Sequence, residues 1–119
     1  IIFHNALNTK KIKILKKKGI KLIRSKIDNK KMFNLKTVLK KLYILGVRNL
    51  LVEGGDKITK NLIQNRLIDK FYLFKSPKNL LISKEYMTFT SLDTLNSKYK
   101  NKTNISPKLA KDNITIYKR

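Results

Sequence analysis

Cysteine and tryptophan are absent from this chain of 119 residues, and histidine occurs once, as His4. The lack of cysteine excludes a disulfide-stabilised scaffold and any thiolate metal site, and it agrees with a reducing compartment. A single histidine at the end of a strand is more typical of a packing or surface residue than of a catalyst or metal ligand. No apolar run approaches the roughly 18 residues of a membrane helix. We therefore expect a cytoplasmic protein without a metal site or a membrane span.

Acidic residues are also scarce, because seven Asp and Glu stand against 29 Lys and Arg, for a net charge of +22. A dense basic surface binds polyanions by releasing counterions, so a basic nucleic-acid-binding module is one interpretation. The excess is nearly all lysine, however, and accompanies many isoleucines and asparagines, as A/T-rich codons would produce. Lys16 to Lys18 precede Gly19 at a predicted helix end, where cations complement the helix dipole. No basic motif interleaved with aromatic residues is present, which disfavours nucleic acid as the partner.

Of only four glycines, two are adjacent, at Gly54 and Gly55. The segment from Leu50 to Asn61 reads as an apolar strand that ends on Glu53, a glycine turn, and an amphipathic helix that begins at once. Backbone N–H groups without partners gather at a helix N-terminus, together with the positive end of the helix dipole, and they favour phosphate. Glycine lets the backbone approach a ligand closely. The segment therefore predicts a phosphate-binding turn.

Helix and strand patterns alternate around this turn. Asn34 is a plausible N-cap for an apolar stripe that runs to Leu45, and Gly46 suits the C′ position. Residues 49–52 form a short continuous apolar run, the pattern of a strand covered on both faces. A second helix is predicted over 56–65, with Ile58, Leu62 and Ile63 inward, and a strand over 71–74, whereas 96–104 predicts a loop or a ragged edge strand. This alternation indicates an α/β fold.

The same residues resemble a known family. Three segments in order along the chain resemble the reductase domain of the bifunctional riboflavin-biosynthesis deaminase/reductase. They are Leu45 to Gly55, Leu67 to Leu73, and Ser76 to Lys78. Its pattern there is an apolar strand, Val-Glu-Gly-Gly, a helix, Leu-Val-Asp-Glu, an apolar strand and a Pro-Lys corner. Less distinct similarity extends to strands at residues 1–4, 19–24 and 111–117. Lys70 in place of the usual acid, and the lack of a glycine after Lys78, depart from the pattern.

The resemblance implies a dihydrofolate-reductase-like fold, with a mixed, mainly parallel sheet and flanking helices. It also implies NADPH-dependent reduction of 5-amino-6-(5-phosphoribosylamino)uracil to the ribitylamino product. In the family, the residue equivalent to Glu53 binds the pyrimidine part of the substrate. The cofactor phosphates are held by the turn and helix start, which correspond here to Gly54, Gly55, Asp56, Lys57, Ile58, Thr59, Lys60 and Asn61. The proton donor is left unassigned.

The resemblance covers only the second half of the family domain, since nothing here matches the Ser-Leu-Asp-Gly segment of its first half. We therefore expect residues 1–119 to be the C-terminal part of a single reductase domain, incomplete at its N-terminus and inactive alone. A deaminase domain fused upstream and a homo-oligomer are further expectations, as is a strained or cis peptide bond between Gly54 and Gly55. Two other functions stay open: a related reductase acting on another pterin or pyrimidine, and the basic nucleic-acid-binding module.

Overall fold

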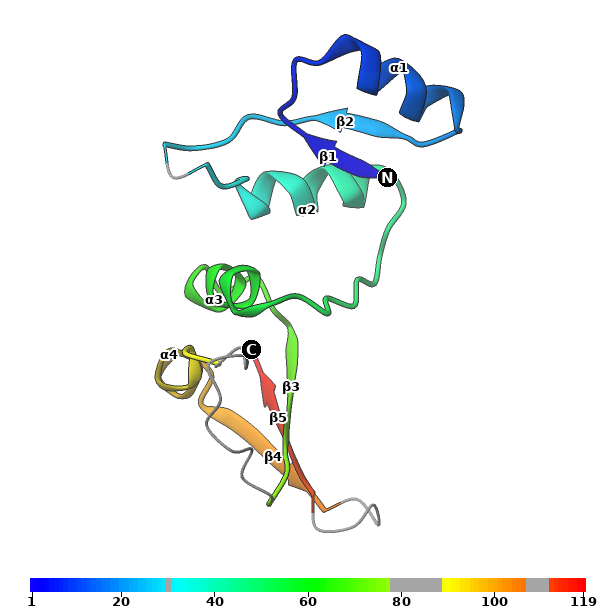
Figure 1. The fold of residues 1–119 in the computed structure, drawn as a ribbon. Coiled ribbons are helices and arrows are strands. Elements are labelled where there is room, and N and C mark those ends of the chain that lie inside the picture. The colour runs from blue at the N-terminus through cyan, green and yellow to red at the C-terminus, as the bar shows by residue number, and fades with distance from the viewer. Residues whose placement is uncertain (30, 78–88, 107–111) are drawn as a thin grey trace. The chain divides into compact units, whose positions relative to one another are not determined.

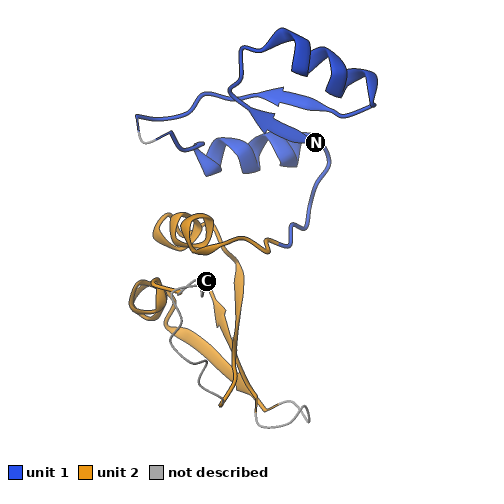
Figure 2. Ribbon diagram, viewed as in Figure 1, with its two compact units in different colours: residues 1–51 blue, residues 52–119 orange. Residues whose placement is uncertain are grey.

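The computed structural model describes residues 1–29, 31–77, 89–106 and 112–119. The chain divides into two compact units, residues 1–51 and residues 52–119, which Figure 2 draws in blue and orange. Each unit has its own sheet, and each is described by itself below.

Unit 1 contains a parallel β/α/β element followed by a helix. Strand β1 (Ile2–His4), helix α1 (Thr9–Lys17) and strand β2 (Leu22–Arg24) precede helix α2 (Leu35–Ile44), as Figure 1 shows. Strands β1 and β2 pair in parallel, with Phe3 opposite Ile23. Short antiparallel strands can be joined by a tight turn, whereas a parallel pair needs a longer crossover, which α1 supplies here.

The ends of both helices in unit 1 follow from their sequence. The side chains of Asn8 and Asn34 each accept a hydrogen bond from the N–H three residues further on, at 3.0 Å, and so cap α1 and α2. Gly19 and Gly46 follow the two C-termini with φ of 73° and 91°, a conformation that glycine adopts without steric cost. The predicted N-cap at Asn34 and the C′ stop at Gly46 are confirmed.

The described residues of unit 2 form an antiparallel sheet and two helices. They comprise helix α3 (Asp56–Gln64), strand β3 (Lys70–Lys75), helix α4 (Leu92–Lys98), strand β4 (Asn101–Ile105) and strand β5 (Asn113–Lys118). The strand order is β3-β5-β4, and both pairings are antiparallel (Figure 1). The core consists of buried side chains from both helices and the middle strand, and partly buried side chains pack against it. These residues are Ile63, Leu95, Tyr99 and Tyr117, with Ile68, Phe71 and Leu73 around them.

Two of the fold expectations are wrong. Strand pairing among the described residues is not mainly parallel, because only β1 and β2 pair in parallel there and both pairings in unit 2 are antiparallel. The predicted strand over residues 49–52 does not form either, and Leu51 is 80% exposed. An apolar run predicts burial, but a strand also needs a neighbour for its N–H and C=O groups. None of the sheets among the described residues extends to this run.

Smaller differences concern α3 and the segment 96–104. Of the three side chains predicted to face inward from α3, Leu62 and Ile63 are buried, whereas Ile58 is 40% exposed. The segment 96–104 holds the end of α4 and most of β4, so the edge-strand alternative is confirmed and α4 was not predicted. A helix as short as α4 gives little periodicity to recognise.

No helix in the described part of the chain is long and apolar enough to cross a membrane.

Candidate functional site

A hollow of about 370 Å³ in unit 2 brings together much of the predicted site. Its lining includes five predicted residues from the glycine turn and the start of α3, and three aromatic residues that were not predicted to belong to a site. The lining residues are Val52, Glu53, Gly54, Gly55, Asp56, Thr59, Phe71, Tyr72 and Phe89. The other four predicted cofactor residues, Lys57, Ile58, Lys60 and Asn61, lie on α3 outside this lining.

The glycine turn is shaped by close packing, not by an unusual peptide bond. The Gly54–Gly55 peptide is trans, since the described residues contain no cis bond, and neither glycine has a positive φ. The expected strained or cis bond is therefore wrong. Gly54 has another reason to lack a side chain, because a Cβ there would overlap the Cγ2 of Ile58. The backbone of Gly54 thus comes close to the first turn of α3.

The N-terminus of α3 leaves backbone donors available. Gly55 is the N-cap, in an extended conformation, and it offers no side-chain cap to the first turn. The first N–H groups of any helix have no partner within the helix and carry the positive end of its dipole. Thr59 donates through Oγ1 to the Gly54 carbonyl at 3.4 Å, so the turn is held against the helix. Lys57 and Lys60 are exposed on the same helix and add positive charge.

Asp56 has hydrogen-bond partners at the residues just before α4. Its carboxylate accepts hydrogen bonds from the Thr90 hydroxyl at 2.7 Å, the Thr90 N–H at 3.1 Å and the Ser91 hydroxyl at 3.4 Å. The bond from the Thr90 hydroxyl is the largest cause that holds the pKa of Asp56 below its ordinary value. Since Ser91 is the N-cap of α4, Asp56 ties the beginning of α3 to the beginning of α4. The carboxylate is therefore directed toward Thr90 and Ser91 of the same chain.

Glu53 and three aromatic side chains line part of the hollow. Glu53 is exposed and makes no hydrogen bond or ion pair with the described residues, so its oxygens can accept from a ligand. The rings of Phe71 and Phe89 stack at 5.8 Å between centroids, with 16° between their planes. Phe71 also meets Tyr117 edge to face, at 6.3 Å and 69°. A flat ring with N–H donors matches a carboxylate beside an aromatic wall.

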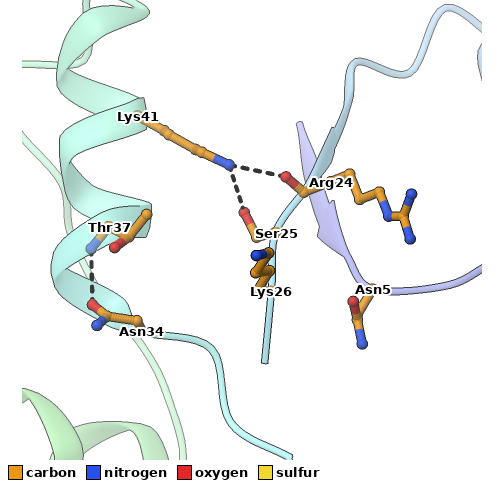
Figure 3. A pocket seen from close by; sticks show the side chains of 7 residues that line it. All are labelled: Asn5, Arg24, Ser25, Lys26, Asn34, Thr37 and Lys41. Atoms are coloured by element: carbon orange, nitrogen blue, oxygen red, sulfur yellow. Dashed lines mark hydrogen bonds between the residues drawn. The ribbon is translucent and has the colours of Figure 1, made fainter. Parts of the chain in front are cut away.

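Unit 1 has a larger hollow, of about 640 Å³, that the sequence interpretation missed. It lies where β1 and β2 end and α2 begins, and three cationic side chains and no acid line it (Figure 3). Its lining residues are Asn5, Arg24, Ser25, Lys26, Asn34, Thr37 and Lys41. The Lys41 ammonium donates to the Arg24 carbonyl and to the Ser25 hydroxyl, both at 2.9 Å. The sequence signal that was missed is the pair Arg24 and Lys26 at the carboxyl end of the parallel strand β2. Ligands bind at this end of the strands in open α/β sheets.

His4 lines neither hollow. Its Nδ1 is buried without a hydrogen-bond partner among the described residues, and the side chain is partly buried at the end of β1. The residues that the structure describes contain no group of three or more His, Asp or Glu side chains that could hold a metal ion.

Comparison with known proteins connects both units to one family. The family model described as the RibD C-terminal domain matches residues 1–110. The riboflavin biosynthesis protein RibD of Aquifex aeolicus (strain VF5) is 36% identical over 64 residues, which are 54% of this chain and 17% of that protein. The chain thus matches less than a fifth of the length of this relative.

Proposed function

Because the chain belongs to the RibD C-terminal domain family, we propose that it acts in the reductase step of riboflavin biosynthesis. The proposed reaction reduces 5-amino-6-(5-phosphoribosylamino)uracil to the ribitylamino product. NADPH supplies the hydride, and the protein supplies binding, orientation and electrostatics. We also propose that residues 1–119 form the C-terminal part of a single reductase domain. A deaminase domain in the same polypeptide stays a prediction.

The observation that supports this substrate best is the carboxylate of Glu53 beside the stacked Phe71 and Phe89. A uracil ring is flat and carries N–H donors along its edge. A carboxylate accepts such donors in charge-assisted hydrogen bonds, which are stronger than bonds between neutral groups. An aromatic wall favours a flat ring through its apolar and quadrupolar surface. Glu53 is therefore the residue that we propose to orient the pyrimidine.

Two features support a cofactor rich in phosphate. The first is the N-terminus of α3, where backbone donors lack a side-chain cap and Lys57 and Lys60 lie nearby. The negative charge of Asp56 opposes phosphate there, but its hydrogen bonds direct it toward Thr90. The second feature is the basic hollow of unit 1, where Arg24, Lys26 and Lys41 face no acidic side chain in the lining. Cations and helix N-termini bind phosphate groups. Each feature therefore suits the phosphates of NADPH.

The substitution Glu53→Gln tests the site, because it removes the charge and nearly keeps the shape. The chain would be joined to the preceding part of Aquifex aeolicus RibD, and NADPH oxidation would be followed with substrate present. Loss of one charged hydrogen bond predicts a kcat/KM about ten- to a hundredfold lower. NADPH affinity, measured separately by titration, should change little.

Asp93→Asn is the matched control, since Asp93 is an exposed acid in the first turn of α4 and does not line the hollow. This variant should keep the kcat/KM of the parent. Full activity of Glu53→Gln would refute the role of Glu53. A folded parent protein that bound NADPH but did not oxidise it with this substrate would refute the reaction.

A further inference from the structure

Two aromatic rings that line the hollow of unit 2 differ in how the chain supports them. Phe71 lies on β3, is partly buried and meets Tyr117 of the core edge to face. Phe89 stacks on Phe71 but is 36% exposed, and it belongs to no helix or strand. Irregular backbone is less restrained than a helix or a strand, so the position of its side chains depends on contacts made close by. The contacts beside Phe89 therefore decide where this wall of the hollow lies.

Asp56 holds the peptide group that directly follows Phe89. The N–H of Thr90, which is part of the peptide unit that joins Phe89 to Thr90, donates to Oδ1 of Asp56 at 3.1 Å. The Thr90 hydroxyl donates to the other carboxylate oxygen, Oδ2, at 2.7 Å. Hydrogen bonds to a carboxylate are stronger than bonds between neutral groups, and two of them to one group also fix orientation. The position of the Asp56 carboxylate therefore restrains the backbone that carries the Phe89 ring.

Both sides of this connection are anchored in the core. Asp56 is the first residue of α3, and Ile63 of the same helix is fully buried. On the other side, Ser91 is fully buried at the N-cap of α4, and Leu95 of that helix is fully buried as well. The Ser91 hydroxyl makes no cap bond to α4 and donates to Asp56 at 3.4 Å. Because packed cores resist deformation, the connection transmits the position of α3 to the residues before α4.

We propose that Asp56 is a positioning residue that holds the Phe89 ring beside Glu53, in the hollow that all three residues line. It acts through Thr90, and Phe89 thereby determines specificity for a flat ring. A ring that is held in place before the substrate arrives does not have to be ordered on binding, which favours affinity. The inference rests on the proposed function for its substrate, whereas the connection from Asp56 to Phe89 does not.

Kinetics of the chain joined to the preceding part of Aquifex aeolicus RibD test this role. Asp56→Ala should raise the KM for the pyrimidine substrate about three- to tenfold and change kcat little, because stacking stabilises the ground state and the transition state alike. Thr90→Val keeps the charge of Asp56 but loses the bond at 2.7 Å, and should raise the same KM by a smaller factor. Neither change should weaken NADPH binding, since Asp56→Ala removes a charge that opposes phosphate. Weaker NADPH binding with an unchanged substrate KM would overturn the proposal.

A double-mutant cycle shows whether Asp56 acts through the Phe89 ring. Phe89→Leu alone should raise the substrate KM, and adding Asp56→Ala to it should cause no further rise, because the ring to be positioned is gone. Asp93→Ala is the matched control, since Asp93 is also an acid in the first turn of a helix but does not line the hollow. This control should keep the KM of the parent. Additive effects of Asp56→Ala and Phe89→Leu, or an equal rise in Asp93→Ala, would overturn the proposal.

A spectroscopic measurement tests the connection without substrate or NADPH, so failure of the proposed reaction leaves its result valid. Because the chain has no tryptophan, Phe89→Trp introduces a single fluorescent reporter at the wall of the hollow. In this background, Asp56→Ala should shift the emission to longer wavelength and increase quenching by acrylamide, since the released ring enters water.

Asp93→Ala in the same background should change neither emission nor quenching. If Asp56→Ala does not fold, as judged by circular dichroism, Thr90→Val takes its place and should shift the emission in the same direction. Emission and quenching that stay at the values of the Phe89→Trp parent in the folded variant would overturn the positioning role of Asp56.

Discussion

The two units bury very different amounts of apolar surface. In unit 2, Ile63 and Leu95 are fully buried, and Tyr99 and Tyr117 are nearly so. In unit 1, Ser25 is the one buried side chain among the described residues, and the apolar stripe of α2 is only partly buried. Both units have helices with apolar residues, and the side-chain caps belong to the helices of unit 1, so local sequence signals do not favour unit 2. This difference shows that the sequence signals for helices and strands can produce those elements in a unit that buries almost no apolar side chain among its described residues.

Sheet architecture accounts for part of this difference. A parallel pair of strands is usually found with both faces covered, and β1 and β2 contribute only three residues each. The antiparallel sheet of unit 2 needs cover on one face, and α3 and α4 provide the apolar side chains for it. We therefore expect stability to be concentrated in unit 2, and the following predictions test this contrast from the largest expected effect to the smallest.

Leu95→Ala should cause the largest loss of stability. Removing a fully buried leucine leaves a cavity, and such changes cost about 2 to 5 kcal/mol. The matched change in unit 1, Leu42→Ala on α2, should cost roughly 1 kcal/mol because Leu42 is only partly buried. Urea unfolding followed by circular dichroism measures both free energies. Equal losses would contradict the contrast between the units.

Lys41→Met should produce a smaller effect, confined to unit 1. The variant keeps the apolar stem but loses the bonds to the Arg24 carbonyl and the Ser25 hydroxyl, and it leaves a polar group of buried Ser25 without this partner. We expect a loss of about 1 kcal/mol. Amide hydrogen exchange should accelerate in β2 and α2 and stay unchanged in β5. Lys40→Met, at an exposed position, is the control, and the same acceleration there would contradict this account.

Asp56→Asn should give the smallest effect, limited to acid conditions. Since the folded pKa of Asp56 is lower than 3.8, its contribution is fully present above that pH and is lost as pH falls through the folded pKa. Thermal unfolding at a series of pH values should show a smaller acid-induced loss in Asp56→Asn than in the parent protein. Asp93→Asn removes the same charge but keeps the bonds to Thr90. An identical acid profile for Asp56→Asn and the parent would exclude this contribution.

Much of the local structure followed from the sequence. The asparagine N-cap and the glycine C′ residue set the bounds of α2, and apolar periodicity located α3 and β3, because these signals act within a few residues. The apolar run at residues 49–52 was wrongly predicted to be a strand. Hydropathy indicates burial, but it does not show whether a neighbouring strand is present to pair with the run. The Glu-Gly-Gly turn was found because its residues are contiguous, whereas Phe89 was missed because it meets Phe71 from a distant part of the chain.

The sequence by itself determined the family, the glycine turn before α3, the ends of α2 and the absence of thiol chemistry. Each of these depends on residue identity or on neighbours within a turn of helix. Only the tertiary structure decided that Asp56 ties α3 to α4 and that Lys41 donates a hydrogen bond to Ser25. Those contacts join residues far apart in the chain, and their existence depends on how sheets and helices pack, which no local pattern specifies.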